Sequence, residues 1–248
     1  MNFGPLPDDW PVQRDTLHFL AAHLLAQARQ RHDGLFDLVP TPGGFATPPV
    51  GPERERVRLV GGSMLVERVT GETIRDASAT TTVTSVAGSS LADLCRQIGF
   101  EPNPDFWVGN DTPPFRDPDV PIQLDGHATS ILGEWYVLGQ RSIDEVVASL
   151  PHADATVGRL WPEHFDYGID LDAAPGVRCN LGAAGGDGFH AEPYFYVGPH
   201  GPERPGATDY WNAPFGATIG FGDLDSADDP VRSAIEFMMT GIFLLRSA

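Results

Sequence analysis

Lysine is absent from this chain of 248 residues, and all sixteen basic side chains are arginine. A Schiff base cannot form without a lysine amine, so pyridoxal phosphate enzymes and class I aldolases are excluded. The Gly-Lys-Ser/Thr phosphate loop and the strand lysine of protein kinases are missing for the same reason. The permitted cofactors therefore do not include pyridoxal phosphate.

Cysteine is scarce as well, with only Cys95 and Cys179. No Cys-x-x-Cys occurs, so zinc ribbons and thioredoxin-like redox sites are excluded. Two isolated cysteines in a chain of this length are typical of a reducing compartment. The first ten residues lack the basic and apolar regions of a signal peptide, and no uncharged apolar run of about 18 residues occurs. We expect a cytoplasmic protein with free thiols and no membrane partner.

Positive charge is limited, because 16 basic residues stand against 34 acidic ones and the net charge is −18. Such a chain repels phosphate backbones and anionic lipid, so nucleic acid is not an expected partner. The hydrophobic share of 41% and the charged share of 20% are ordinary for a globular protein. The composition therefore predicts a folded, acidic protein.

Apolar periodicity predicts helices at residues 12–32, 91–98, 129–150 and 230–246. Gly34 stands where the first helix should end, and Gly139 is expected to bend or interrupt the third. Strands are predicted at 57–60, 64–69, 80–86, 165–171, 177–181, 193–198 and 216–222. The sum is an α+β fold, a mainly antiparallel sheet of roughly seven to nine strands packed with three or four helices.

The domain organisation depends on the Pro- and Asp-rich segment 101–128, a long loop or a linker. We expect a single α+β domain over residues 1–248, with two sub-halves, 1–100 and 129–248, joined by that segment as the alternative. Asp228 or Asp229 caps the C-terminal helix, and its apolar residues cover more than the usual stripe. That helix is therefore expected to be buried in the protomer or in a homodimer interface.

Three motifs resemble those of an uncharacterised bacterial family, a domain of unknown function common in actinobacteria. They are Asp15-Thr16-Leu17-His18, Trp161-Pro162-Glu163-His164-Phe165-Asp166 and Glu192-Pro193-Tyr194-Phe195-Tyr196-Val197. The Asp-capped terminal helix is similar too. The resemblance spans most of the chain, but the 101–126 loop and the helix after it depart from it. No established activity comes with the family, so the resemblance implies no catalytic residue.

Two His-x-carboxylate pairs, His164-x-Asp166 and His190-x-Glu192, form a candidate metal site. Residues two apart on a strand point to the same face, so each pair would present an imidazole beside a carboxylate. Two neighbouring strands would then supply two nitrogen and two oxygen ligands, which suits zinc, iron or manganese. The alternative is that each histidine only hydrogen-bonds its neighbouring carboxylate.

Aromatic residues in the C-terminal half suggest a small-molecule pocket. The candidate pocket residues are His18, Trp161, Tyr194, Tyr196 and Trp211. The same rings would equally serve an ordinary β core. His18 lies beside the apolar stripe of the first helix, whereas His23 and His32 are expected at the surface.

Two classes of function remain. The first is a small-molecule-binding or scaffold protein with a C-terminal pocket of aromatic, histidine and carboxylate side chains. The second is a divalent-metal-dependent hydrolase or oxygenase that uses the two His-x-carboxylate pairs. No nucleophile elbow of the Gly-x-Ser-x-Gly type occurs, so the first class is preferred.

Overall fold

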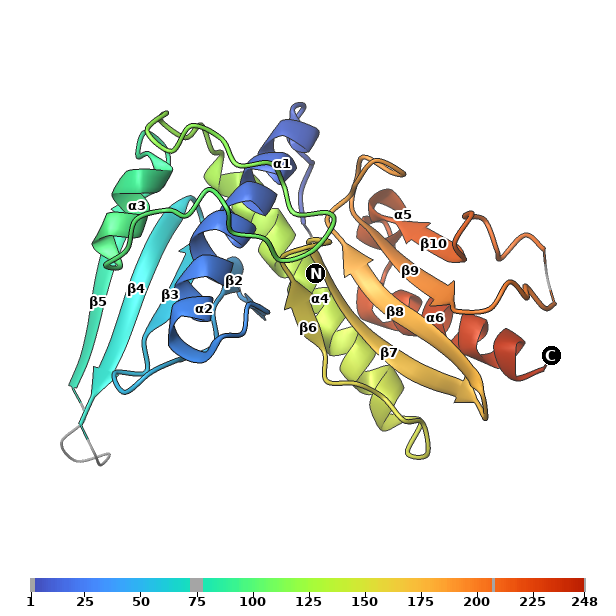
Figure 1. Ribbon diagram of the computed structural model, residues 1–248. Coiled ribbons are helices and arrows are strands. Elements are labelled where there is room, and N and C mark those ends of the chain that lie inside the picture. The colour runs from blue at the N-terminus through green and yellow to red at the C-terminus, as the bar shows by residue number, and fades with distance from the viewer. Residues whose placement is uncertain (1–2, 72–77, 207, 248) are drawn as a thin grey trace. The chain divides into compact units, whose positions relative to one another are not determined.

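The structure is a computed structural model that describes residues 3–71, 78–206 and 208–247 (Figure 1). The chain divides into two compact units, and the division falls within helix α4 (Gly126–Ala148). The N-terminal unit comprises Leu6–Glu134 and Leu160–Phe165. The C-terminal unit comprises Met1–Pro5, Trp135–Arg159 and Asp166–Ala248. The Pro- and Asp-rich segment 101–128 thus lies wholly within the N-terminal unit.

The N-terminal unit begins with one uninterrupted helical run. It consists of α1 (Trp10–Leu20), the π-helical turn η1 (Ala21–Ala26) and α2 (Gln27–Asp33). Leu17, Leu20 and Leu24 are completely buried on its predicted apolar face. Gly34 ends the run with φ 76°, a left-handed conformation that glycine adopts without steric cost.

The sheet of this unit has five antiparallel strands in chain order. They are β1 (Val39–Thr41), β2 (Gly44–Ala46), β3 (Arg56–Val60), β4 (Ser63–Thr70) and β5 (Ser78–Ser85). The strands predicted at 57–60 and 64–69 form the hairpin β3–β4, which turns at residues 61–62. Alternation along β4 buries Met64 and Val66, so that one face of the strand joins the core. Helix α3 (Leu91–Gln97) follows, with Ser90 and Asp93 in a reciprocal capping box.

The segment from 101 to 125 is fastened to the first helical run by polar side chains. The Gln27 side chain donates to the Asn103 carbonyl and accepts from the Asn103 amide. The Gln13 side chain accepts from the Asp125 amide, 2.8 Å away. His23 Nε2 lies 2.7 Å from the Pro113 carbonyl oxygen. The segment is therefore an ordered covering layer of its own unit.

His23 is buried, with 1% of its surface exposed, and the expectation of a surface position was wrong. Helical periodicity cannot reveal that a segment some 90 residues later in the chain covers this side of the helix. Burial lowers the pKa of His23, and the hydrogen bond to Pro113 opposes that shift. His32 is exposed at the end of α2, as expected.

The second sheet has the strand order β10-β9-β8-β7-β6 and is also antiparallel. Its strands are β6 (Arg159–Trp161), β7 (Asp166–Ala174), β8 (Val177–Ala184), β9 (Tyr194–Pro199) and β10 (Ala217–Gly220). The predicted α+β class and antiparallel pairing are confirmed. The described strands form two sheets of five, whereas the sequence predicted one sheet of seven to nine.

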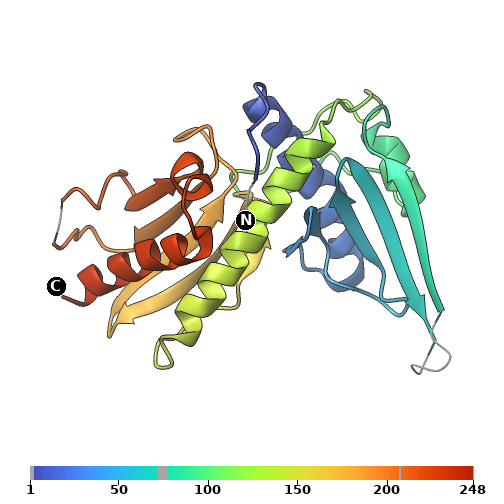
Figure 2. The ribbon, with the colours of Figure 1, turned by 180° about the vertical axis from the view of Figure 1, so that it is seen from behind.

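Helices cover one face of the sheet in the C-terminal unit and leave the other open. Figure 2 shows α6 (Pro230–Arg246) lying across strands β7 to β10, on the face turned away from the viewer in Figure 1. On the covered face, Trp135 of α4 donates to the Ala184 carbonyl and contacts the Phe195 ring. Helix α4 continues through Gly139, which lies close to Ala183 and produces no break.

Helix α6 begins as the sequence predicts. The Asp229 side chain accepts a hydrogen bond from the Arg232 amide, and Pro230 occupies the first turn. Met238 and Ile242 are completely buried, whereas Phe243 on the outer side is 67% exposed. One side of the helix is therefore buried within the protomer. A homodimer through its outer side stays a prediction.

The N-terminal residues join the C-terminal unit. The Phe3 ring contacts the rings of Trp135 and of Phe221, which begins helix α5 (Phe221–Asp225). The Phe3 amide donates to Asp225, 3.2 Å away. Among the described residues, no helix has the length and apolar character needed to cross a membrane.

Candidate functional site

Four aromatic rings meet at one end of the open sheet face in the C-terminal unit. Tyr194 and Tyr196 come from β9, and the loops before β9 and β10 contribute Phe189 and Phe215. The Phe189 and Phe215 ring centroids lie 5.1 Å apart, and each of these rings is within 6.4 Å of Tyr194. We call Phe189, Tyr194, Tyr196 and Phe215 the aromatic cluster. Phe189 and Phe215 are 47% and 37% exposed, so the cluster presents apolar surface to solvent.

Both tyrosine hydroxyls of the cluster donate to carboxylates. Tyr194 donates to Asp187 over 2.7 Å, and Tyr196 makes a short hydrogen bond to the buried Asp166. Burial, reinforced by these carboxylates, raises both tyrosine pKa values well above their usual range. The phenols therefore stay protonated as donors, and their rings are held in place.

Glycine makes room for the Tyr196 side chain. Tyr196 pairs in register with Gly182 of β8, which in turn pairs with Gly168 of β7. A Cβ atom on Gly182 would collide with the Tyr196 phenol. The ring can therefore cross the sheet to reach Asp166 because this row of the open face carries no side chains on the two neighbouring strands.

Asp187 organises the turn that precedes β9. One of its carboxylate oxygens accepts from the amides of Phe189 and His190, at 2.8 and 3.0 Å. Its other oxygen accepts the Tyr194 hydroxyl. The His190 ring lies edge-on to Tyr194 at a centroid distance of 5.9 Å. Asp187 thus fixes the position of Phe189 and His190 at the rim of the cluster.

Of the five pocket residues predicted from sequence, the structure groups Tyr194 and Tyr196. Trp211 of the same unit donates to the Pro205 carbonyl and contacts Tyr210 and Arg204, and Arg204 donates to the Phe215 carbonyl over 3.1 Å. His18 and Trp161 belong to the N-terminal unit.

In that unit, Trp161 contacts the Phe36 ring, and His18 Nε2 is 3.0 Å from the carbonyl oxygens of Pro162 and Glu163. Burial lowers the pKa of His18, and these carbonyl contacts oppose the shift. These contacts fit a neutral imidazole whose Nε2–H group donates to the two carbonyl oxygens, which is a structural role.

The four predicted metal ligands do not occupy strands as pairs. Strand β7 begins at Asp166, and Phe165 before it has φ 54°, so His164 does not share a strand face with Asp166. His164 Nδ1 instead lies 2.9 Å from Asp111. His190 and Glu192 lie on the exposed turn before β9, where Pro193 precedes the strand.

Within residues 3–71, 78–206 and 208–247, no group of three or more His, Cys, Asp or Glu side chains could hold a metal ion. Asp166 hydrogen-bonds Tyr196. The structure offers the four-ligand site no support, and that site stays a prediction.

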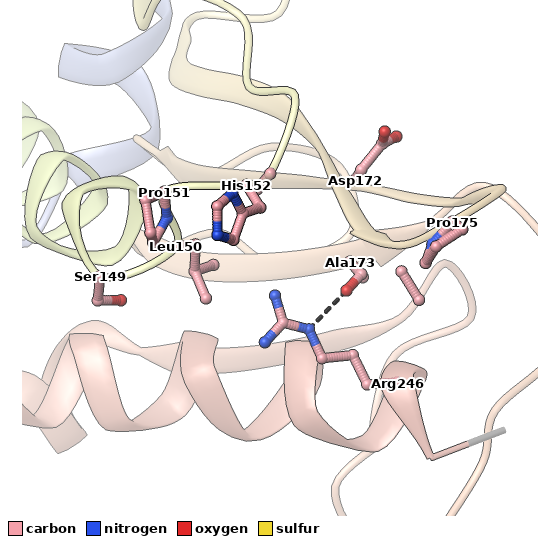
Figure 3. Close-up of a pocket in the computed structure, with 10 residues that line it drawn as sticks. Ser149, Leu150, Pro151, His152, Asp172, Ala173, Pro175 and Arg246 are labelled. Atoms are coloured by element: carbon pink, nitrogen blue, oxygen red, sulfur yellow. Dashed lines mark hydrogen bonds between the residues drawn. The ribbon is translucent and has the colours of Figure 1, made fainter.

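A cleft of about 600 Å³ lies at the other end of the C-terminal unit. It is lined by residues 149–153 after α4, by residues 172–175 at the β7–β8 turn and by Arg246 of α6 (Figure 3). We call it the Arg246 cleft. Its walls carry apolar side chains from Leu150, Pro151 and Pro175, and its polar groups include His152.

Sequence reasoning missed Phe189 and Phe215 of the aromatic cluster, Asp187 that bonds Tyr194, and the whole Arg246 cleft. Asp187 carried a local signal, since an Asp followed by Gly in a glycine-rich turn often bonds amides two and three residues on. The cleft had no such signal, because three segments distant in sequence form it.

Comparison of the chain with protein-family models, with curated proteins and with solved structures found no match in any of the three. The resemblance to an actinobacterial family therefore stays a prediction.

Proposed function

We propose that the protein binds a small organic cation on the aromatic cluster, in a non-catalytic role. The observation that carries this proposal is the exposed pair Phe189 and Phe215, set beside tyrosines whose hydroxyls are bonded to carboxylates. Ring faces attract cations by about 0.5–2 kcal/mol, with the larger values in desolvated sites. The carboxylates of Asp187 and Asp166 add Coulombic attraction of the same sign, and the Arg204 guanidinium at the Phe215 carbonyl offsets part of it.

Rigidity and net charge support the same ligand class. Asp187 fixes the turn that carries Phe189, so little conformational freedom is lost on binding. Glu192 is exposed on this turn and adds negative charge. The net charge of −18 raises the local concentration of cations and repels anions and nucleic acid. A cytoplasmic location belongs to the same proposal and is supported by two buried, free thiols.

A titration with choline and its uncharged carbon analogue 3,3-dimethylbutan-1-ol tests the proposal. The two probes have nearly the same shape, so a difference in affinity isolates the positive charge. Choline should bind saturably, by calorimetry or by shifts in the NMR spectrum, and the alcohol should bind more weakly. Equal binding of both probes, or binding of neither, would sink the proposal.

Variants locate the binding. Replacing Phe189 or Phe215 by Ala should weaken choline binding about threefold to tenfold, since each removes one ring face. The control is Phe243→Ala, which removes an exposed ring of the same unit from the outer side of α6. It should leave the affinity unchanged, and an equal loss in the control would move the site away from the cluster.

The alternative is a divalent-metal-dependent hydrolase or oxygenase with His164, Asp166, His190 and Glu192 as ligands. No observation on the described residues favours it, and elemental analysis of the purified protein would test it directly.

A further inference from the structure

We infer that the Arg246 cleft is a second binding site, which takes a small aliphatic carboxylate through the Arg246 guanidinium. The cleft belongs to the C-terminal unit but shares no residue with the aromatic cluster, and its ligand has the opposite charge. Its volume of about 600 Å³ falls in the range of small-molecule sites, about 300–1,000 Å³.

Arg246 is anchored in a way that leaves its outer edge available. Its Nε donates to the Ala173 carbonyl over 2.6 Å, which fixes the guanidinium against the end of β7. Figure 3 shows the two terminal nitrogens of the guanidinium extending into the space below residues 149–153. No carboxylate of the described residues pairs with it, unlike Arg232 on the same helix, which pairs with Glu236. A guanidinium held this way matches the paired oxygens of a carboxylate.

The acidic residue of the cleft does not compete for Arg246. The Asp172 carboxylate points away from Arg246 in Figure 3 and is 2.7 Å from an Arg178 nitrogen. Arg178 also pairs with Asp170 and Asp154, at 3.1 and 3.7 Å. The remaining ionisable side chain that lines the cleft is His152, whose ring lies on the cleft wall. Arg246 is thus the cationic group that the cleft offers to an anion, inside a strongly acidic chain.

Two fields oppose the arginine. Helices α4 and α6 both end at the cleft, and each C-terminus carries about half a negative charge, so together they are comparable to the charge of Arg246. These partial charges are spread over the last carbonyl groups of each helix, whereas the guanidinium presents its hydrogen-bond donors directly to the ligand. The distant acidic residues are screened at physiological salt, because the Debye length is about 8 Å. The direct contact between the Arg246 guanidinium and the ligand's carboxylate therefore determines which ligands bind.

The side chains of the cleft walls favour an alkyl chain as the apolar part of the ligand. Leu150, Pro151, Ala174 and Pro175 offer aliphatic carbon, and the residues that line the cleft include no Phe, Tyr or Trp. A short alkyl chain buries its methylene groups against such walls, at about 0.8 kcal/mol for each CH₂. Multiply charged phosphate gains nothing from them. An alkyl carboxylate is the ligand that both the guanidinium and the walls accept.

Hexanoate, hexan-1-ol and inorganic phosphate are suitable probes, each titrated into the 248-residue protein by calorimetry. Hexanoate should bind saturably, with a Kd on the order of millimolar for a ligand of this size. The other two should bind at least several-fold more weakly. Failure of hexanoate to saturate, or equal binding of any other probe, overturns the inference. Choline binding at the aromatic cluster is unaffected by either result, so the two proposals fail separately.

Arg246→Gln should weaken hexanoate binding by about tenfold or more, because a hydrogen-bonded charge pair is lost. Arg232→Gln is the matched control and should bind as the wild type does. Circular dichroism of the unliganded Arg246→Gln protein checks that it folds. If it does not, Arg246→Lys decides, since it keeps the charge but loses the paired donors and should bind several-fold more weakly. Wild-type affinity in whichever of these two variants folds overturns the inference.

Discussion

His18 and Phe165 lie face to face, with ring centroids 5.0 Å apart and ring planes 3° from parallel. Phe165 has φ 54°, a conformation that costs a residue with a side chain roughly 1–2 kcal/mol. The Phe165 amide also donates to the Trp161 carbonyl, which closes the turn. His18 binds two carbonyls of this turn and covers its strained residue. Two of the motifs that carry the family resemblance therefore meet in a structural contact, and neither needs a catalytic role.

Stability should depend on pH through His18 and His23. Burial lowers both folded-state pKa values below the ordinary 6.5, so the unfolded chain binds protons first as pH falls. The stabilisation is complete above about pH 7 and is lost below pH 6.5, at up to about 1.4 kcal/mol per pH unit for each histidine. Urea unfolding between pH 7.5 and 5 measures it. His18→Gln and His23→Gln should each flatten the slope, whereas Phe243→Ala should not.

Gln27→Leu should release the segment 101–125. The change removes two hydrogen bonds to the Asn103 backbone and should cost about 1–3 kcal/mol. Proteolysis within the segment should accelerate, because it is held mainly at such points. Gln30→Leu alters an exposed glutamine of the same helix and is the control. Equal cleavage rates in both variants would show that Gln27 does not hold the segment.

A methyl group added at Gly182, beside Tyr196 on the open sheet face, should destabilise the protein. Gly182→Ala forces the Tyr196 ring aside and should lower the unfolding free energy by about 1–3 kcal/mol. Tyr196→Phe removes the hydrogen bond to Asp166 and should cost a similar amount. Gly188→Ala, at an exposed position where a Cβ meets no atom within 4 Å, should change stability by less than about 0.5 kcal/mol.

The cost of shortening a side chain of helix α6 should depend on whether it lies on the buried or the outer side of the helix. Ile242→Ala opens a cavity in the covered face and should cost about 2–5 kcal/mol. Phe243→Ala, one residue on, should cost less than about 0.5 kcal/mol if that side faces solvent. A larger loss that grows with protein concentration would instead indicate a homodimer through the outer side of α6.

The two thiols should be inert in the folded protein. Cys95 and Cys179 are buried and free, and burial raises the pKa of each to about 12. At pH 8 almost no thiolate is present in either, so a thiol reagent should react slowly with native protein. Both should react fully after denaturation. Rapid labelling of the native state would indicate local opening.

The sequence predicted best those features that depend on neighbouring residues. The helix end at Gly34 and the cap of α6 at Asp229, one of the two predicted capping residues, follow from local hydrogen bonding and allowed φ values. The two-residue alternation of the strands gave their positions but not their grouping into two sheets. The grouping depends on which strands pair with each other, and the residue pattern of a single strand does not show its partner.

Long-range contacts explain what sequence reasoning missed. His23 is buried by a segment far along the chain. The His-x-carboxylate pairs were assigned to strands that in fact begin at Asp166 and Tyr194, after both histidines. Tyr194 and Tyr196 share one face because they are two apart on β9, but His190 and Glu192 lie before the strand and do not extend that row. Arg246 lines a cleft only because three segments that are separate in the sequence come together around it, and no local pattern shows this.

Phe3 has a consequence for how the protein is made. It contacts Phe221 and hydrogen-bonds Asp225, a partner 222 positions later in the chain. At a synthesis rate of roughly 5–20 residues per second, Phe3 waits about 10–40 s on the ribosome before that partner emerges. The Phe3 side chain thus lacks these two partners throughout that interval, and only Trp135, which is made earlier, can cover it before then.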